Sequence, residues 1–371
     1  MKQDLENTIK SFFQSCYELR SWRILVLREV LRWVTFIGMN NPRVDDEAYV
    51  QFLVATPVVV SALEAERVQP DVPKAPSHDA FTRFLHRHDP DSTTLWNEVA
   101  PLIARTGGVL VLDDSTLDKP RARQIDLVGY HWSGNHHAVV RGINLLTLLW
   151  SDGDRFYPCD FRIYHKPSDG FTKNDHFETL LRVAKSRGFQ PDAVLFDSWY
   201  ASVENLKLVR EFGWSFVTRL KANRMVRIDR GEAKAVSDQP IAATGTTVWL
   251  PAFGLVRVFR VVAPNGDTTH WVTNELEMEP MRQQMFAEWS WSIEEYHRGL
   301  KQFTGVEKCQ VRSASGQRNH VGCAIRAFVR LEYHRFTTGM SWFDAKMRII
   351  RDAVRAYLSD PLYRLPNRAT A

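Results

Sequence analysis

Residues 289–301 read Trp-Ser-Trp-Ser-Ile-Glu-Glu-Tyr-His-Arg-Gly-Leu-Lys. Apolar residues recur through this stretch at helical spacing, so it predicts an amphipathic helix. Glu294, Arg298 and Lys301 follow one another at intervals of four and three residues, which places one carboxylate and two cations on the same helix face. A carboxylate held among cations stays ionised and is able to bind a divalent metal, while the cations face a polyanion. Taken alone, the pattern is more typical of a solvated helix face with ion pairs.

Two short apolar runs upstream each lead into a carboxylate. Gly108-Val-Leu-Val-Leu runs into Asp113 and Asp114, and Ala193-Val-Leu-Phe runs into Asp197. Uninterrupted apolar runs of this length are typical of central buried strands. Mixed sheets flanked by helices bind ligands at strand ends, so we expect these acids to meet Glu294 there. Because side chains alternate along a strand, only one of Asp113 and Asp114 points into such a site.

Three carboxylates that converge without Cys or His ligands favour a hard cation, Mg²⁺ or Mn²⁺. Two such ions hold the attacking and leaving oxygens of a phosphodiester displacement. The histidines of the central region do not have the paired spacing of zinc ligands. The four cysteines of the sequence are scattered without a Cys-x-x-Cys pair, so neither a structural zinc site nor a disulfide framework is implied.

The composition indicates a folded protein with a polyanionic partner. The 371 residues are 44% hydrophobic and 25% charged, which predicts a globular chain of two or three domains. The net charge of +5 favours a partner such as DNA. The most apolar N-terminal run, residues 22–39, is interrupted by Arg and Glu, so it predicts a buried or amphipathic helix rather than a membrane span or a signal peptide. We therefore expect a cytoplasmic protein without a membrane partner.

The hydrophobic period divides the chain into four parts. Residues 1–95 predict helices, forming an N-terminal domain that suits either DNA binding or a helical cap on the core. Residues 96–221 predict the first part of a core that alternates strands and helices. Residues 222–285 predict a β-rich insertion, with a hairpin turn at Pro-Asn-Gly-Asp267. Residues 286–371 predict the second part of the core, with the helix of Glu294 and two C-terminal helices.

Three motifs resemble those of the DDE transposases of bacterial insertion sequences. They are Val-Leu-Asp-Asp-Ser-Thr at 111–116, Phe-Asp-Ser-Trp-Tyr-Ala-Ser at 196–202, and Ile-Glu-Glu-Tyr-His-Arg-Gly-Leu-Lys at 293–301. The resemblance covers about residues 75–360 of this sequence. It implies an α/β fold, an RNase H-like mixed sheet flanked by helices, with an N-terminal helical domain and a β-rich insertion before the catalytic Glu.

The resemblance implies that Asp114, Asp197 and Glu294 are the catalytic acids and hold two ions, Mg²⁺ or Mn²⁺. Asp114 is preferred to Asp113 because the family's first acid is followed by a pair of hydroxyl residues, as here by Ser-Thr. A Tyr, Arg, Glu, Lys signature surrounds the family's third acid. Its Glu and Lys match Glu294 and Lys301, whereas Ala287 and Ser290 stand where its Tyr and Arg would be. We expect Trp289 and Trp291 to lie in the core rather than to stack on a base.

Five cations are expected to contact DNA phosphates: Arg219, Lys221, Arg224, Arg298 and Lys301. The function implied is that of a transposase that binds the terminal inverted repeats of its element, cleaves the ends and joins the 3′ ends to target DNA. It would act as a homodimer in the complex with DNA, in association with the nucleoid. Two alternatives stay open: a non-transposing RNase H-like metal nuclease, and a catalytically inactive DNA-binding repressor.

Overall fold

The computed structural model describes residues 42–57, 59–87, 92–134, 137–229 and 231–362. The chain divides into two compact units, Met1–Arg43 and Val44–Ala371, and all elements named below belong to the second. The helices predicted within the first 41 residues, including the apolar run at 22–39, lie outside the described residues.

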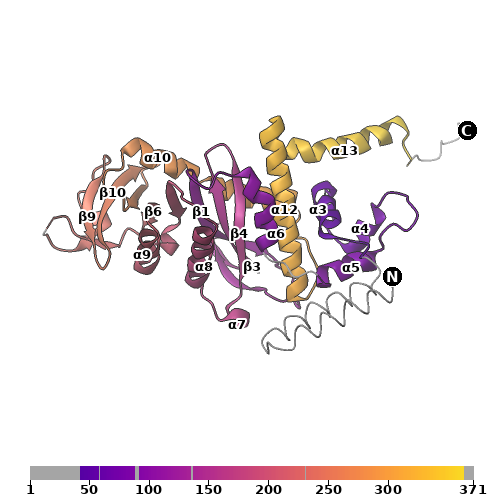
Figure 1. Cartoon of the computed structure of the whole chain (residues 1–371), viewed down its shortest axis with the longest axis horizontal. Coiled ribbons are helices and arrows are strands. Elements are labelled where there is room, and N and C mark those ends of the chain that lie inside the picture. The colour runs from indigo at the N-terminus through magenta and orange to yellow at the C-terminus, as the bar shows by residue number, and fades with distance from the viewer. Residues whose placement is uncertain (1–41, 58, 88–91, 135–136, 230, 363–371) are drawn as a thin grey trace, which may run out of the picture. The chain divides into compact units, whose positions relative to one another are not determined.

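Among the described residues, nine strands form one mixed sheet (Figure 1). Its first half follows the order β4-β3-β1-β5-β6. β1 pairs antiparallel with β3 and parallel with β5, and β5 pairs parallel with β6. The strands are β1 (Val109–Asp118), β3 (Ala138–Ser151), β4 (Phe156–Tyr164), β5 (Ala193–Phe196) and β6 (Phe216–Leu220). The prediction of a mixed sheet flanked by helices is confirmed.

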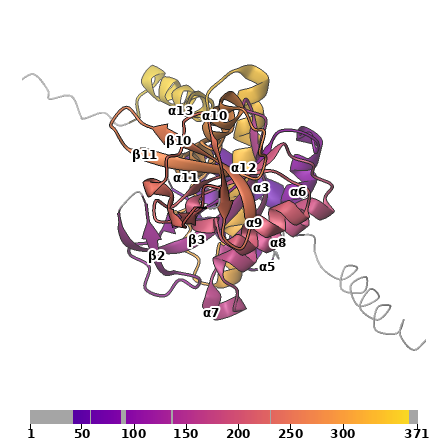
Figure 2. The same cartoon turned by 90° about the vertical axis from the view of Figure 1, so that its left-hand side faces the viewer.

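The β-rich segment continues this sheet. β11 (Thr268–Thr273) pairs antiparallel with β6 and is followed outward by β10 (Gly254–Val262) and β9 (Thr246–Leu250) (Figure 2). A small separate hairpin joins β7 (Met225–Val226) to β8 (Lys234–Ala235), and η3 (Val236–Asp238) follows it. Strands are therefore present where the sequence predicts them, and the sheet crosses from the core into the insertion without a break.

Strand β1 is longer than the apolar run predicts, because its polar second half also pairs with β3 as far as Asp118. β3 in turn extends beyond β1 and pairs with β2 (Gly129–Ser133). The consequence for the site is that both Asp113 and Asp114 lie within a paired strand and face opposite sides of the sheet.

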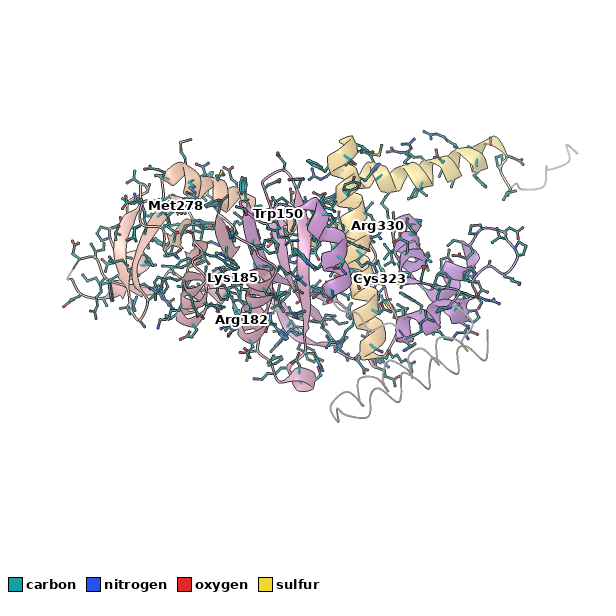
Figure 3. The ribbon with its side chains drawn as sticks, in the orientation of Figure 1. Trp150, Arg182, Lys185, Met278, Cys323 and Arg330 are labelled. Atoms are coloured by element: carbon teal, nitrogen blue, oxygen red, sulfur yellow. The ribbon has the colours of Figure 1, made fainter. Side chains whose placement is uncertain are left out.

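Several helices of the first half of the unit pack on one long helix. α12 (Ala314–Thr338) contacts α3 (Asp46–Ala55), α5 (His78–Arg87) and α6 (Ser92–Val99), while α4 (Ala62–Arg67) packs on α5 and η1 (Ala100–Leu102) follows α6. Arg326 of α12, with a side chain only 7% exposed, pairs with Asp46 at 2.7 Å and with Glu98 at 2.5 Å. Arg330, which Figure 3 labels on the same helix, pairs with Glu98 at 3.1 Å. These contacts hold α3 and α6 to α12, and the expected DNA-binding role of residues 1–95 stays a prediction.

The other helices lie close to the strands that carry the acids. α7 (Lys166–Asp169) precedes α8 (Lys173–Ser186), which packs on β3 and β4, and α9 (Val203–Glu211) follows η2 (Ser198–Tyr200) and packs on β6. α10 (Pro280–Trp289) leads into α11 (Ser292–Phe303), which packs on β1, α12 and α13 (Trp342–Ser359). A Cβ at Gly299 of α11 would lie 2.7 Å from the Phe328 ring, so the glycine permits this close helix packing.

Gly142 tests the pairing of the strand that carries Asp113. A Cβ at this position would lie 2.4 Å from the Leu117 carbonyl oxygen and 2.6 Å from the Thr116 methyl. We expect Gly142→Ala to lower the free energy of unfolding by about 1–3 kcal/mol, as overpacking does. Urea unfolding measures this value. The matched control is Gly134→Ala in the same hairpin, where a Cβ meets nothing within 4 Å and the change should stay within about 0.5 kcal/mol. Equal effects of the two substitutions would contradict the close strand approach.

Candidate active site

The register of two strands brings two of the acids side by side. Leu112 of β1 lies opposite Phe196 of β5 in the last parallel pair between these strands, so the next residues, Asp113 and Asp197, lie side by side just beyond that pairing. Glu294 in the first turn of α11 joins them. A cavity of about 180 Å³ and a second one of about 510 Å³ are both lined by these same three carboxylates. Asp113, Asp197 and Glu294 therefore converge where the two cavities meet.

Asp114 lies on the other side of β1 in a dense set of polar contacts. Its carboxylate accepts hydrogen bonds from Lys173 at 2.7 Å, from Asn144 at 2.7 Å and from the Tyr200 hydroxyl at 2.5 Å. Burial by itself raises the pKa of Asp114, but the Lys173 charge and the three hydrogen bonds outweigh burial and lower the pKa below its usual value. Asp114 also lines the larger cavity, so it is near the other acids, but its negative charge is already paired with Lys173.

Asp113 has the opposite environment. Burial raises its pKa well above the usual range, and the negative charges of Asp114, Glu294 and Asp197 raise the pKa further. Within the described part of the chain, the side chain of Glu294 forms neither a hydrogen bond nor an ion pair. Asp197 accepts a hydrogen bond from the Ser198 amide at 2.6 Å and pairs with Arg219 at 3.2 Å. The carboxylates around Asp113 thus form a cluster of negative charge that is only partly balanced.

This donor set has the chemistry of a site for a hard divalent cation. All three acids offer carboxylate oxygens, and a cation between them would offset the repulsion that raises the pKa of Asp113. The residues that the structure describes contain no group of three or more His, Cys, Asp or Glu side chains already arranged as a metal site. The fit therefore rests on the type of ligand and the shared cavities.

Two of the five predicted phosphate-binding cations lie near the acids, and a third does not. Arg219 lines the smaller cavity beside Asp197, and Lys301 lines the larger one and donates to the Thr116 carbonyl oxygen at 2.8 Å. Arg298 instead pairs with Glu295 at 3.7 Å on the exposed face of α11 and is outside the lining of both cavities.

The remaining two, Lys221 and Arg224, line a separate cavity of about 560 Å³ that also contains Trp199. Trp289 packs against the core, as expected, whereas Trp291 is 68% exposed and lines the smaller cavity of the acids.

The contacts of Asp114 involve three residues that sequence reasoning missed. Asn144 is a polar residue within the apolar run of β3, and a buried polar residue in such a run is a usable signal. Lys173 begins α8, where a capping box of Thr172 and Asp175 fixes the first turn and points the lysine at β1. Tyr200 stands in the motif that follows Asp197, and nothing in its spacing indicates a contact with β1.

Residues 61–244 match the family model of the DDE superfamily endonuclease. The resemblance to DDE enzymes is therefore confirmed over these residues, which include Asp113, Asp114, Asp197 and Arg219 but stop before Glu294. The chain is also similar to the piggyBac transposase in a cryo-EM structure of its synaptic complex with hairpin DNA. The TM-score is 0.48 at 13% identity, and the similarity covers 90% of this chain and 78% of that one.

A search of curated proteins finds no match to this chain. Within its described residues, no helix has both the length and the apolar character needed to cross a membrane.

Neighbouring carboxylates of β1 should respond oppositely to neutralisation in metal-free buffer at pH 7. Asp114→Asn leaves the Lys173 charge without its partner, so the free energy of unfolding should fall by about 3–5 kcal/mol. Asp113→Asn removes a carboxyl whose ionisation is opposed by burial and by like charges, so the free energy of unfolding should rise. Urea unfolding in EDTA measures both values. Changes of the same sign would show that the two environments are not distinct.

The two aspartates should also affect the pH dependence of the free energy of unfolding in opposite directions. The lowered pKa of Asp114 contributes stability above the unfolded pKa of about 3.9, and this stability is lost as the pH falls through the folded pKa. The raised pKa of Asp113 does the reverse, because its contribution is lost as the pH rises from about 3.9 toward the folded value. Asp114→Asn should therefore flatten the acid limb of stability against pH, and Asp113→Asn should flatten the decline on the neutral side.

Proposed function

We propose that this chain is a DNA transposase that cleaves the ends of its element and joins the 3′ ends to target DNA, with two divalent ions held by three carboxylates. The observation that carries the proposal is the convergence of Asp113, Asp197 and Glu294 at two adjoining cavities in a chain that matches the DDE superfamily endonuclease model. Asp113, Asp197 and Glu294 would hold these ions, which would polarise the scissile phosphodiester and lower the pKa of the attacking hydroxyl or water.

In this proposal the first acid is Asp113, whereas the sequence alone predicts Asp114. Two observations support the change. Asp113 is aligned with Asp197 by the strand register and shares both cavities with it. Asp114 already has a cation at 2.7 Å and two further donors, so binding a metal would first require these contacts to break. In our proposal the Asp114 network instead holds β1, β3, α8 and η2 in fixed positions around Asp113.

The cations beside the acids would hold the substrate. Arg219 lies within ion-pair distance of Asp197 and lines the smaller cavity, where it would form an ion pair with a bound phosphate. Lys301 of α11 borders the larger cavity and lies on the same helix face as Glu294, about two turns further along. We propose that these two side chains position the phosphates flanking the cut, with Lys221, Arg224 and Arg298 contacting DNA farther away.

Joining two ends to a target requires two active sites in one complex, so we propose a homodimer bound to terminal inverted repeats and target DNA, associated with the nucleoid. A second candidate is a metal nuclease that cuts without joining. The matching family model is described as an endonuclease, and cutting alone would account for the three carboxylates. Both observations favour this second candidate. Strand joining distinguishes the two, and binding without cutting in either metal would indicate a repressor.

Substitution of any single acid of the cluster should abolish cutting. With Mg²⁺ or Mn²⁺ and DNA carrying the repeats that flank the gene, Asp113→Asn, Asp197→Asn and Glu294→Gln should each reduce end cleavage by about a thousandfold or more, with DNA binding retained. Gel analysis of cleaved and joined products measures this. The matched control is Glu295→Gln, the exposed neighbour of Glu294, which should cut normally. Cleavage retained by Asp197→Asn would reject the assignment.

Metal binding separates Asp113 from Asp114 without reference to activity. A ligand present at 100 times its Kd stabilises a folded protein by about 2.7 kcal/mol. Mn²⁺ should therefore raise the unfolding temperature of the wild type and of Asp114→Asn, and it should leave Asp113→Asn nearly unchanged. Thermal unfolding with and without Mn²⁺ measures the difference. If Asp114→Asn alone loses the response, the acid predicted from the sequence is the ligand.

A further inference from the structure

A line of cavities leads away from the acids toward the insertion. The larger acid cavity and the cavity of Lys221 and Arg224 share one residue, Trp199. A further cavity, of about 410 Å³, is lined by neighbours of the same two segments: Arg227 comes two residues after Met225, and Trp249 two residues before Pro251. Its wall is made by Arg227 and Trp249, whose backbones pair with N···O distances of 2.9 and 2.7 Å. We call the surface formed by Trp199, Lys221, Arg224, Arg227 and Trp249 the β7 groove.

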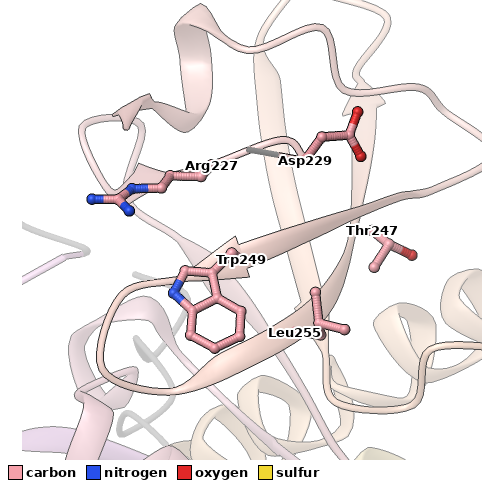
Figure 4. A pocket seen from close by; sticks show the side chains of 5 residues that line it. All are labelled: Arg227, Asp229, Thr247, Trp249 and Leu255. Atoms are coloured by element: carbon pink, nitrogen blue, oxygen red, sulfur yellow. The ribbon is translucent and has the colours of Figure 1, made fainter. Parts of the chain in front are cut away.

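The groove offers two aromatic faces to solvent. Trp199 is 49% exposed and Trp249 is 46% exposed, although tryptophan normally buries most of its surface. Figure 4 shows the Trp249 ring with Arg227 to one side and Leu255 to the other. Met225 in the cavity of Trp199 and Leu255 in the cavity of Trp249, both about half exposed, add to the apolar surface. An exposed apolar surface of this kind, set in a groove, indicates a binding partner with flat apolar faces.

Cations accompany the rings along the same segment. Lys221, Arg224 and Arg227 follow one another at three-residue intervals, and each lines one of the two cavities. One carboxylate, that of Asp229, lines the outer cavity as well, so the net charge of the groove lining is positive. Alternation of exposed aromatic rings with cations is the surface that binds single-stranded nucleic acid, because bases stack on the rings while the cations follow the phosphates.

A duplex fits this arrangement poorly. Its bases are stacked on one another and present only their edges, so an exposed indole face gains little from a paired helix. An unpaired strand presents one π face per nucleotide, and stacking on an aromatic side chain stabilises binding by about 1–3 kcal/mol per base. We infer that the β7 groove binds unpaired nucleotides of a DNA strand whose adjoining phosphodiester lies at the acids, with bases stacked on Trp199 and Trp249. This inference rests on the proposed function for the identity of the nucleic acid.

The test is binding of a fluorescent single-stranded oligonucleotide of about 12 nucleotides to the full chain in EDTA, compared with the duplex of the same sequence. Trp199→Ala and Trp249→Ala should each weaken single-strand binding by about tenfold or more and leave duplex binding within about twofold. Arg227→Ala should weaken single-strand binding and reduce the slope of log K against log salt by about 0.7.

Matched controls come from α12 and α8. Tyr333 is 49% exposed, as Trp199 is, and lies outside the groove, so Tyr333→Ala should bind single strands like the wild type. Arg182→Ala removes an exposed cation from α8 and should leave the salt slope unchanged. Circular dichroism of each variant confirms that it is folded.

Two outcomes overturn the inference: unchanged single-strand affinity in both tryptophan variants, or an equal loss for single strand and duplex. Failure of the proposed function is recognised separately, because EDTA removes cleavage from the measurement. A protein that binds single strands through both tryptophans and never cuts DNA would retain the groove and lose the transposase assignment. One that cuts element ends but binds single strands independently of Trp199 and Trp249 would do the reverse.

Discussion

The parallel pairing of β1 with β5 is the constraint on which the rest of the site depends. The aligned residues Leu112 and Phe196 are buried and form the last pair between the two strands, and each is followed by a carboxylate at the next position. A slip of one residue in a strand moves every side chain to the opposite face of the sheet. In this fold such a slip would exchange the surroundings of Asp113 and Asp114. The apolar run on each strand therefore fixes which acid faces Asp197, although neither run takes part in any chemistry.

The two aspartates of β1 illustrate how one strand serves both stability and function. Asp114 is matched by a cation and two neutral donors from three separate elements, so its charge helps to hold those elements together. Asp113 has a raised pKa because its neighbours are other carboxylates, which is unfavourable in the protein alone. Proteins tolerate such local cost at sites that bind an oppositely charged ligand. The fold can accept the repulsion at Asp113 because the adjacent network at Asp114 fixes the backbone.

Much of this arrangement follows from the sequence, and the rest depends on facts that a sequence does not contain. The apolar runs before Asp113 and Asp197 predict buried strands, and the apolar spacing through Ile293 and Leu300 predicts α11, because each signal is local. The choice between Asp113 and Asp114 is not local, since it requires the register with β5. The antiparallel pairing of β6 with β11 was likewise beyond reach, because alternation identifies strands and not their neighbours.

That last pairing has a mechanical consequence for any nucleic acid bound here. Arg219 on β6 is paired with Trp271 on the adjacent strand β11, and β6 also pairs with β5, whose last residue is followed by Asp197. The insertion is thus joined to the acids through continuous hydrogen-bonded strands. Such a sheet keeps its side chains in fixed relative positions more strictly than a linker would. A substrate held by side chains of the insertion would then present its phosphodiester to the carboxylates at a defined distance, so that binding itself supplies the alignment that phosphoryl transfer requires.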